Sequence, residues 1–428
     1  MISYYDAVKI IQQCTLTIES QLISTENSLH AIAAEDVVSK IMLPPFQSSN
    51  MDGFALNSAA ATRHATELAP VSFHVLSTIA AGDDIESHTA KEDTYFNEPN
   101  IAYEVMTGAP VPASCDAVIP IEEVYLEYDL YNKISKITLN RNVMKSENIR
   151  FQGADFPLNQ IILNKGDKIT PEKIMLLSAL GVASINVFKP IKIAVLSTGK
   201  EIIDDIEQPL QAGQIYNSNS PYLLAALQQF PTTVRKFKTV ADDVPQFHQT
   251  MDEIESYAPN LIISTGAVSA GRWDFIPTAL LERHAEIFFH KTAIKPGKPI
   301  LFAKLNSETQ GPYMFCLPGN PVSTMVGFHF FIEPYLRKSF CMPEQEKFNL
   351  ILNTEGKKKK GMTFFLKAKA SLNSQSQFCA DILQGQESFK MKPLLEANGF
   401  VILDENVEEY TVGQKALFMP LRGIYDSY

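Results

Sequence analysis

The sequence lacks the features that define several classes of protein. Its five cysteines, Cys14, Cys115, Cys316, Cys341 and Cys379, are odd in number and widely scattered. They form no C-x-x-C pair, so they suit neither a disulfide framework nor a zinc site. No stretch approaches the roughly 18 consecutive apolar residues of a membrane-spanning helix, and the first residues, MISYYDAVKI, lack the regions of a signal peptide. We therefore expect reduced thiols, no membrane partner and a cytoplasmic location.

Positive charge is also scarce. The chain has 37 lysines and arginines against 48 acidic residues, and its formal net charge is −11. Such a charge repels nucleic acid and anionic lipid surfaces, so we expect neither as a partner. An anionic small ligand would need a local basic site. The dense basic run KKKK at 357–360 lies between turn residues and predicts only a solvated hairpin tip.

The pattern of apolar residues changes along the chain, which is too long for one hydrophobic core. A helix is expected after Ser3, which can cap it. From about 46 to 140, short apolar runs alternate with Gly, Pro and Ser and indicate a β-rich module. From about 176, buried strands alternate with helices, as in a parallel sheet covered on both faces. The last part returns to short strands and predicts a small β-barrel or sandwich.

Two turns follow buried strands at matching positions, STGKE at 197–201 and STGAVSAG at 264–271. Both would expose backbone N–H groups at a strand end, where a phosphate can bind. A glycine turn between strand and helix is also a common structural necessity. The helix after the first turn is expected to begin with Ser220 as its cap and Pro221 in its first turn.

Three acidic residues, Glu201, Asp242 and Asp274, each follow a predicted strand. In a parallel sheet they should therefore lie on the same edge. Carboxylates gathered there repel one another unless a cation lies between them, and Mg²⁺ bound to phosphate oxygens would satisfy this need. Each acid taken singly could instead be a helix cap or a solvated loop residue.

Basic residues gather in HKTAIKPGKP at 290–299, which presents Lys291, Lys295 and Lys298 around a Pro-Gly-Lys-Pro turn. Proline restricts the backbone on each side, so Lys295 and Lys298 have less conformational entropy to lose on binding. Lysine acts here as a point charge for phosphate or another oxyanion. The alternative is a soluble surface turn.

Two further turns could contribute to a site. In CLPGNPVST at 316–324, Pro321 suits the first turn of a helix, while Asn320 could cap that helix or point into the cleft. In PPFQSSNMDGFAL at 44–56, Asp52 precedes Gly53, a pair that ordinarily marks only a turn.

Together these motifs are more specific than any one of them. The chain resembles the molybdopterin molybdenumtransferase family, the molybdenum insertases, over nearly its whole length. The blocks that carry the resemblance are, in order, PPFQSSNMDGFAL, MTGAPVPASCDAVIPIEE, ENIRFQGADF, LSTGKEI, GQIYNSN, STGAVSAGRWDF, KTAIKPGKP, CLPGNPVS and ANGFVILDENVEEYTVGQ.

The resemblance implies an elongated homodimer of the α/β plus β class, with four domains in each chain. These would be an extended linker domain (1–45 and 140–175), an inserted β-rich domain (46–139), a molybdopterin-binding-type α/β domain (176–343) and a C-terminal small β-barrel (344–428). Members of the family take adenylylated molybdopterin and molybdate, cleave the pyrophosphate link with Mg²⁺, release AMP and leave molybdenum on the dithiolene sulfurs. The molybdopterin adenylyltransferase is then an expected partner.

The resemblance also assigns roles to residues, in a site between the α/β domain of one protomer and the β-rich domain of its partner. The catalytic set is Asp52, Thr107, Asp155, Glu201, Asp242 and Asp274, of which Glu201, Asp242 and Asp274 would bind the metal. The substrate-binding set is Arg150, Ser264, Gly266, Ser269, Lys291, Lys295, Lys298, Pro318, Asn320 and Pro321. Molybdate could be held by Lys291 and Lys295, or by Arg150.

Three departures from the family pattern leave other functions open. Ala267 stands where a glycine is usual, and its methyl group would interfere if that position needs a positive φ. Asn217 stands where the family often has Asp, and lysines in KKKKGMTFFLKA replace frequent arginines. The chain could thus be a non-catalytic, pterin-binding or scaffolding paralogue. A nucleotide-processing hydrolase of the competence-damage-inducible type fits less well, because MDG, LPGNP and ANG match the insertases.

Overall fold

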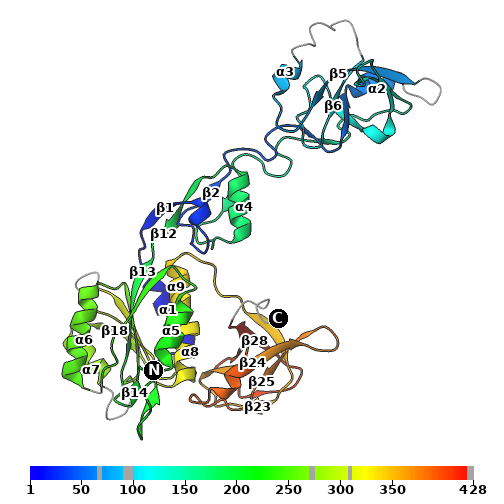
Figure 1. The fold of residues 1–428 in the computed structure, drawn as a ribbon. Coiled ribbons are helices and arrows are strands. Elements are labelled where there is room, and N and C mark those ends of the chain that lie inside the picture. The colour runs from blue at the N-terminus through cyan, green and yellow to red at the C-terminus, as the bar shows by residue number, and fades with distance from the viewer. Residues whose placement is uncertain (65–69, 90–99, 242, 269–274, 307–310, 422–428) are drawn as a thin grey trace. The chain divides into compact units, whose positions relative to one another are not determined.

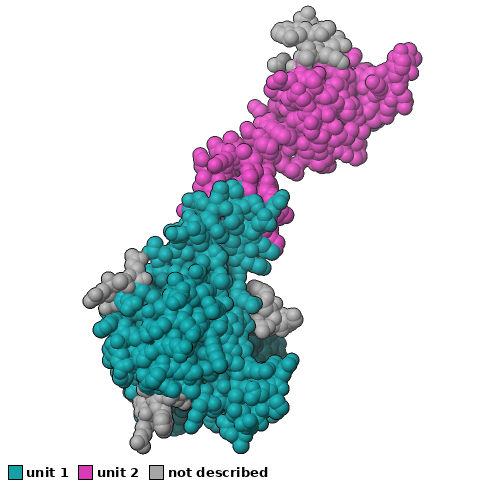
Figure 2. Space-filling view, turned by 60° about the vertical axis from the view of Figure 1, so that its left-hand side comes forward, with its two compact units in different colours: residues 1–35, 164–170, 184–428 teal, residues 36–163, 171–183 magenta. Residues whose placement is uncertain are grey.

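The computed structural model describes residues 1–64, 70–89, 100–241, 243–268, 275–306 and 311–421 (Figure 1). The chain divides into two compact units, which Figure 2 shows in different colours. Unit 1 comprises residues 1–35, 164–170 and 184–428, and unit 2 comprises residues 36–163 and 171–183. Within the described residues, no helix has the length and apolar character needed to cross a bilayer.

Unit 2 is built on a six-stranded sheet with the order β7-β4-β6-β5-β9-β8. Only the β5–β6 pair in this sheet is parallel. Along β4, Phe54 and Leu56 belong to one apolar cluster and Ala55 to another, so both faces of the sheet are covered. The strands are β4 (Gly53–Leu56), β5 (Val71–Ile79), β6 (Ile101–Val105), β7 (Ala117–Pro120), β8 (Tyr125–Tyr128) and β9 (Ile134–Leu139).

Shorter elements complete unit 2. Two small antiparallel pairs join β2 to β11 and β3 to β10. The elements are β2 (Val37–Val38), β3 (Ser48–Ser49), β10 (Ile149–Arg150), β11 (Ile161–Leu163), α2 (Ser58–His64), α3 (Ile85–Thr89) and α4 (Pro171–Ala179). The β-rich character expected from the short apolar runs is thus present.

Unit 1 contains a second six-stranded sheet, with the order β16-β13-β17-β21-β20-β18. The first four strands are parallel, as the alternation of strands and helices predicts, whereas β20 and β18 run antiparallel. The strands are β13 (Ile191–Ser197), β16 (Thr232–Lys236), β17 (Leu261–Thr265), β18 (Glu286–His290), β20 (Leu301–Lys304) and β21 (Tyr313–Leu317).

Helices cover both faces of this sheet. Along β13, Ile193 and Val195 join the apolar cluster on one face, and Ala194 and Leu196 join the cluster on the other. Figure 1 shows α6 and α7 on one side of the sheet and α1, α5, α8 and α9 on the other. The helices are α1 (Tyr4–Gln13), α5 (Asn219–Leu227), α6 (Val244–Tyr257), α7 (Ile276–Glu282), α8 (Pro321–Gly327) and α9 (Glu333–Ser339).

The helix starts test two expectations from the sequence. Ser3 caps α1, because its side chain accepts a hydrogen bond from the Asp6 N–H. The expectation for Ser220 is wrong: α5 begins at Asn219, with Ser218 at the cap position. The side chain of Asn217 instead accepts the hydrogen bond from the Ser220 N–H, at 3.0 Å.

The C-terminal part of unit 1 is a small closed β-barrel. Its strands follow the order β24-β25-β22-β28-β26, and a pairing between β26 and β24 closes it, so the sandwich alternative is excluded. The barrel strands are β22 (Phe348–Leu352), β24 (Thr363–Leu372), β25 (Phe378–Ile382), β26 (Gly399–Leu403) and β28 (Lys415–Pro420). A short strand of the lysine-rich segment, β19 (Ile294–Lys295), pairs with β24.

Three further strand pairs lie outside the large sheets. β1 (Ser20–Ser24) pairs with β12 (Ser184–Phe188), and β23 (Gly356–Lys357) pairs with β27 (Glu409–Tyr410). β14 (Ile202–Ile203) pairs with β15 (Ile215–Tyr216) directly after the first glycine turn. That last pair closes the loop between β13 and α5.

Candidate functional site

Two glycine turns meet at the carboxyl ends of β13 and β17. The last residues of these strands, Ser197 and Thr265, are register partners. The Thr198 N–H donates to the Thr265 carbonyl at 2.8 Å. Gly266 has a φ of +95°, and a Cβ added to it would collide with the Thr198 carbonyl oxygen. Only glycine therefore allows the two backbones to approach this closely.

Ala267 follows in the second turn with a φ of +46°. This position therefore lies in the left-handed region that favours glycine, so the alanine that replaces the usual glycine has a positive φ. An alanine there costs roughly 1–2 kcal/mol relative to the ordinary helical region. The turn keeps its left-handed backbone and carries that strain.

A third turn, formed by residues 318–320, lies beside the first two. A Cβ on Gly319 would stand 3.6 Å from the Gly266 Cα. The Asn219 side chain donates to the Gly319 carbonyl at 2.7 Å, and Thr324 Oγ1 donates to the Pro318 carbonyl at 2.9 Å. Helix α8 starts at Pro321, as predicted.

Asn320 behaves differently from both alternatives drawn from the sequence. It occupies the cap position of α8, but its side chain makes no capping hydrogen bond. Its Nδ2 donates to Ser388 Oγ at 2.9 Å, and the Val322 N–H donates to the Ser388 carbonyl at 3.1 Å. Ser388 belongs to the barrel region, so these two bonds connect the third turn to the barrel. The sequence carries no signal for Ser388.

The three lysines of the 290–299 segment have different surroundings. Lys291 is half-buried and has a φ of +73°, whereas Lys295 and Lys298 are exposed. Lys295 Nζ lies 5.4 Å from the centre of the Phe364 ring, within range of a cation–π contact. Lys295 and Phe364 both line a cavity of about 770 Å³, together with Pro296, Leu366, Gln386 and Tyr410 among other barrel residues.

The lysines that replace arginines do not form a basic face on this cavity. Lys367 is buried, and its Nζ donates to the Lys390 carbonyl at 2.8 Å. Burial is the largest influence on the pKa of Lys367 and lowers it. In the KKKK run, Lys357 and Lys360 are exposed and form ion pairs with Glu409 and Glu408. The run is therefore largely solvated, but the expected hairpin tip is wrong, because β23 pairs with the distant strand β27 and not with β24. Lys358 is half-buried, and its Nζ donates to the Met362 carbonyl at 2.8 Å.

Of the three acids expected to bind a metal, the structure describes only Glu201. It is exposed, and its carboxylate lies against Gly199 in the first turn. Asp242 and Asp274 lie outside the described residues, as does Ser269. In the part of the chain that the structure describes, no three His, Cys, Asp or Glu side chains are arranged to hold a metal ion.

Ser264 is fully buried in β17, where it stands opposite Cys316 of β21 in the register. Burial is the largest influence on the pKa of the Cys316 thiol and raises it to about 12. Ser264 therefore lies within the sheet, one residue before the strand end, and not in the turn.

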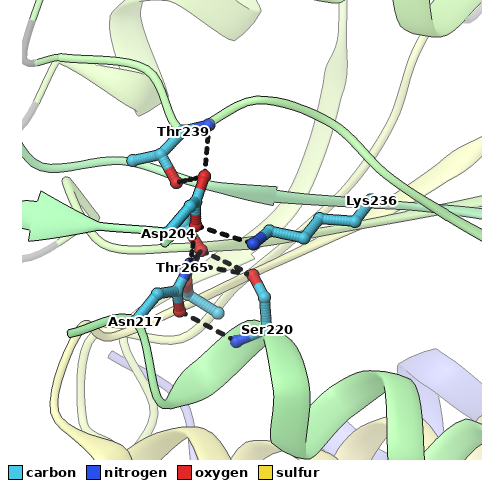
Figure 3. Close-up of polar contacts among 7 residues, drawn as sticks. Asp204, Asn217, Ser220, Lys236, Thr239 and Thr265 are labelled. Atoms are coloured by element: carbon cyan, nitrogen blue, oxygen red, sulfur yellow. Dashed lines mark hydrogen bonds and ion pairs between the residues drawn. The ribbon is translucent and has the colours of Figure 1, made fainter. Parts of the chain in front are cut away.

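A polar network lies behind the first two turns (Figure 3). Ser197 Oγ lies 3.2 Å from Thr265 Oγ1 and 2.8 Å from Ser220 Oγ. Asn217 Nδ2 lies 3.1 Å from Ser197 Oγ and donates to Asp204 Oδ1 at 2.8 Å. Asn217 thus meets a carboxylate from its own loop. Sequence reasoning singled out Asn217 but missed Asp204, because a neighbour across a loop leaves no local signal.

Asp204 has two more partners. Lys236 Nζ lies 2.7 Å from Asp204 Oδ1, and Thr239 Oγ1 donates to Asp204 Oδ2 at 2.9 Å. Burial raises the pKa of Asp204, but the hydrogen bonds from Lys236, Asn217 and Thr239 together outweigh burial and hold this pKa below its usual value. The carboxylate is therefore ionised at neutral pH.

The remaining expected site residues belong to unit 2. The Thr107 N–H and Oγ1 donate to Asp52 Oδ1 at 2.6 and 2.9 Å, and these bonds lower the pKa of Asp52. Arg150 is exposed and donates to Asn50 Oδ1 at 3.0 Å. Asp155 is exposed, and its N–H donates to the Leu43 carbonyl at 3.0 Å. The structure thus joins Asp52 to Thr107.

Comparison with known families covers most of the chain. Residues 2–181 match the MoeA N-terminal region (domain I and II), and residues 194–338 match the probable molybdopterin binding domain. Residues 349–421 match the MoeA C-terminal region (domain IV).

Curated relatives and a solved structure agree with these matches. A molybdopterin molybdenumtransferase of Synechococcus elongatus is 33% identical over 409 residues, which cover 94% of this chain and 95% of the relative. A protein of the same name from Haemophilus influenzae is 30% identical over 416 residues, 96% of each chain. A crystal structure of the molybdopterin biosynthesis MoeA protein from Pyrococcus horikoshii has the same fold, with a TM-score of 0.81, 24% identity and coverage of 99% of this chain and 100% of that one. The chain therefore belongs to the MoeA family of molybdopterin molybdenumtransferases, as its motifs predict.

Proposed function

We propose that this protein acts in molybdenum cofactor biosynthesis as a molybdopterin molybdenumtransferase. It would insert molybdenum from molybdate into adenylylated molybdopterin and release AMP. The observation that carries this proposal is the close approach of the Thr198–Gly199 and Gly266 turns at the carboxyl ends of neighbouring parallel strands, the edge of an α/β sheet where ligands bind. The N–H groups of Thr198, Gly199 and Gly266 hold the turns together, because they donate to the carbonyls of Thr265, Val240 and Leu317. The relatives that share this name match more than nine-tenths of the chain.

The chemistry requires positioning and charge neutralisation more than a covalent nucleophile. When a phosphoanhydride is cleaved, one P–O bond breaks and negative charge develops on the leaving phosphate. Fixed donors and cations stabilise that charge in the transition state. In our proposal the glycine turns position the pyrophosphate, while Lys291, Lys295 and Lys298 supply positive charge on the segment that follows β18.

For molybdate we propose the cavity between the lysine-rich segment and the barrel. The cavity has a volume of about 770 Å³, and Lys295 on its wall offers an exposed ammonium group to an oxyanion. Lys295→Ala should then raise the molybdate concentration needed for half-maximal AMP release. Arg150→Ala, in unit 2, is the matched variant that removes the other expected cation. If Arg150→Ala alone changes the molybdate dependence, molybdate binds elsewhere.

We propose that AMP release requires Mg²⁺. Mg²⁺ would supply charge neutralisation at the pyrophosphate, held by Glu201 with Asp242 and Asp274, two residues outside the described part of the chain. Chelation with EDTA should abolish AMP release, and added Mg²⁺ should restore it. Full activity in EDTA would remove the metal from the proposal.

We also propose that the protein is a cytoplasmic homodimer that receives its adenylylated substrate from the molybdopterin adenylyltransferase. Each chain would have four domains, formed by residues 1–45 with 140–175, 46–139, 176–343 and 344–428. Asp52 and Thr107 belong to unit 2 and the glycine turns to unit 1, so a site shared between protomers can be tested by complementation. Asp52→Ala and Lys295→Ala homodimers should each release little AMP at limiting molybdate, and heterodimers formed by mixing them should regain activity there. No recovery, with heterodimers present, would contradict the shared site.

The central test uses the purified protein with adenylylated molybdopterin. AMP is measured by chromatography with and without molybdate, and molybdate should increase its release. Pterin binding without any molybdate-dependent AMP release would instead favour the non-catalytic paralogue. The comparisons do not favour that alternative, because the near-full-length relatives carry the name of an enzyme.

A further inference from the structure

The Asp204 carboxylate uses all of its acceptor positions within the protein. A carboxylate offers about four such positions. Oδ1 accepts from Lys236 Nζ at 2.7 Å and Asn217 Nδ2 at 2.8 Å, and Oδ2 accepts from the Thr239 Oγ1 and N–H at 2.9 and 3.3 Å (Figure 3). These partners come from the end of β16, the loop that follows it and the loop before α5. Asp204 therefore joins segments that are distant in sequence.

From Asp204 the contacts continue to the strand ends. Asn217 links Asp204 to Ser197 Oγ, at 3.1 Å, and Ser197 Oγ lies 3.2 Å from Thr265 Oγ1. Ser197 and Thr265 are the last residues of β13 and β17 and directly precede the two glycine turns. Asp204 is thus connected to the residues before both turns through the side chains of Asn217, Ser197 and Thr265.

Asp204 also fixes the direction of the Asn217 amide. An ionised carboxylate can only accept hydrogen bonds, and the Ser220 N–H on the other side of the amide can only donate. Asn217 consequently turns Nδ2 toward Asp204 and Oδ1 toward Ser220, at 2.8 and 3.0 Å. A reversed amide would place an oxygen against the carboxylate and a donor against a donor.

We propose that Asp204 is a positioning residue for the glycine turns: through Asn217 it holds both turns in the shape that receives the pyrophosphate of the substrate. This inference rests on the proposed function and gives a role to a residue outside the catalytic and substrate-binding sets expected from the sequence. Asp204 does not touch the reacting atoms. Its negative charge is offset by Lys236, so the network adds no net repulsion behind an anion-binding turn.

Two single variants change the charge of the network in opposite directions. Asn217→Asp places a second carboxylate against Asp204 and adds negative charge behind the turns, so it should raise KM for adenylylated molybdopterin. Asp204→Asn removes the charge that pairs with Lys236 and frees the Asn217 amide, so the turns should be held less firmly, and kcat should fall as KM rises. We expect changes of about tenfold, the factor that corresponds to about 1.4 kcal/mol.

The exchange variant Asp204→Asn with Asn217→Asp tests the pairing itself. It keeps one carboxylate and one amide at the same two positions, so it should recover much of the activity that Asn217→Asp loses, because contacting residues are energetically coupled. Asp205→Asn is the matched control. It removes the same charge one residue away, from an exposed side chain that accepts from the Glu207 N–H in its own turn.

The experiment measures kcat and KM for AMP release at saturating molybdate, with the melting temperature of every variant. Lower melting temperatures with unchanged kcat and KM would overturn the inference and leave Asp204 a purely structural role. An exchange variant as impaired as Asn217→Asp would overturn the pairing. If the wild-type protein releases no AMP, the proposed function fails, and calorimetric titration with adenylylated molybdopterin then decides the inference: equal affinity in all variants overturns it, and weaker binding by Asn217→Asp supports it.

Discussion

Two aspartates in different units are held by a threonine in the same way. In unit 2, Thr107 donates its N–H and its Oγ1 to one oxygen of Asp52, and in unit 1, Thr239 donates the same two groups to one oxygen of Asp204. The surroundings differ. The Asp52 carboxylate is exposed and, among the described residues, accepts hydrogen bonds only from Thr107, whereas the Asp204 carboxylate also accepts from Lys236 and Asn217.

This difference separates a carboxylate that can act on a ligand from one that can only position other groups. The hydrogen bonds from Thr107 lower the pKa of Asp52, so Asp52 is ionised at neutral pH with one oxygen still open. The pKa of Asp204 is also lowered, although burial opposes its partners, but every acceptor position is used. Similar hydrogen bonds therefore do not imply similar roles.

The largest effect is expected from Asp52→Asn. The amide can still accept from Thr107, so the local structure should persist, but the charge and an open anionic oxygen are lost. If Asp52 contributes directly to the reaction, kcat should fall by about a hundredfold, the scale of a lost electrostatic or acid–base group. The measurement is AMP release at saturating substrate, together with the melting temperature.

A matched control for Asp52→Asn is Asp84→Asn in the same unit. Asp84 is also exposed and accepts a backbone hydrogen bond, from the Glu86 N–H at 3.1 Å. We expect no loss of activity in this variant. If the Asp52→Asn protein is as active as the Asp84→Asn protein, the open carboxylate oxygen of Asp52 is not used in the reaction. The proposed difference in role between Asp52 and Asp204 would then be wrong.

A smaller effect is expected from Asp204→Asn on acid stability. Because the pKa of Asp204 is lowered in the folded state, its contribution to stability is fully present above the unfolded pKa of about 3.9 and is lost as pH falls through the folded pKa. The wild-type melting temperature should therefore fall more steeply below pH 4 than that of Asp204→Asn. Melting curves from pH 7 to pH 3 measure this, and parallel curves would contradict it.

The sequence predicts the fold well where its pattern is local or periodic. The apolar run at 191–197 forms a buried strand, and the Ser3 cap starts α1 as expected. The antiparallel direction of β18 and β20 is not predicted, because strand direction within a sheet depends on contacts between distant segments. The wrong cap at Ser220 has a similar cause, since Asn217 accepts the Ser220 N–H from outside the helix.

The candidate site is predicted only in part. Glycine turns and lysine-rich segments have sequence signals, and the structure brings the 198–199, 266 and 318–320 turns together. Asp204, Lys236 and Ser388 have none, because each gains its role from a partner across a loop or from the barrel. Sequence motifs therefore indicate the turns themselves. The side chains that hydrogen-bond to residues of these turns are found only from tertiary contacts.

Ser388→Ala tests whether the barrel holds the 318–320 turn in place, as we propose that Asp204 does for the first two turns. The variant removes the 2.9 Å hydrogen bond from Asn320 and keeps the backbone bond from Val322. We expect a loss of about 1 kcal/mol in the free energy of unfolding, typical for one hydrogen bond, and a modest rise in KM. Denaturant titration and steady-state kinetics measure both. Ser371→Ala, an exposed barrel serine, is the control, and equal values for the two variants would exclude a supporting role for Ser388.

The smallest effect is expected from Ala267→Gly, which tests the turn itself. Ala267 has a φ of +46°, so glycine should relieve backbone strain, while its greater freedom in the unfolded chain offsets part of the gain. The net increase in the free energy of unfolding should be about 0.5–1 kcal/mol. Ala225→Gly, within helix α5, is the control with the opposite sign, because glycine destabilises a helix interior by about 1 kcal/mol. Destabilisation by both variants would show that the Ala267 methyl group contributes packing that outweighs its strain. Stabilisation by Ala267→Gly with unchanged kcat and KM would show that the turn keeps its shape with either residue.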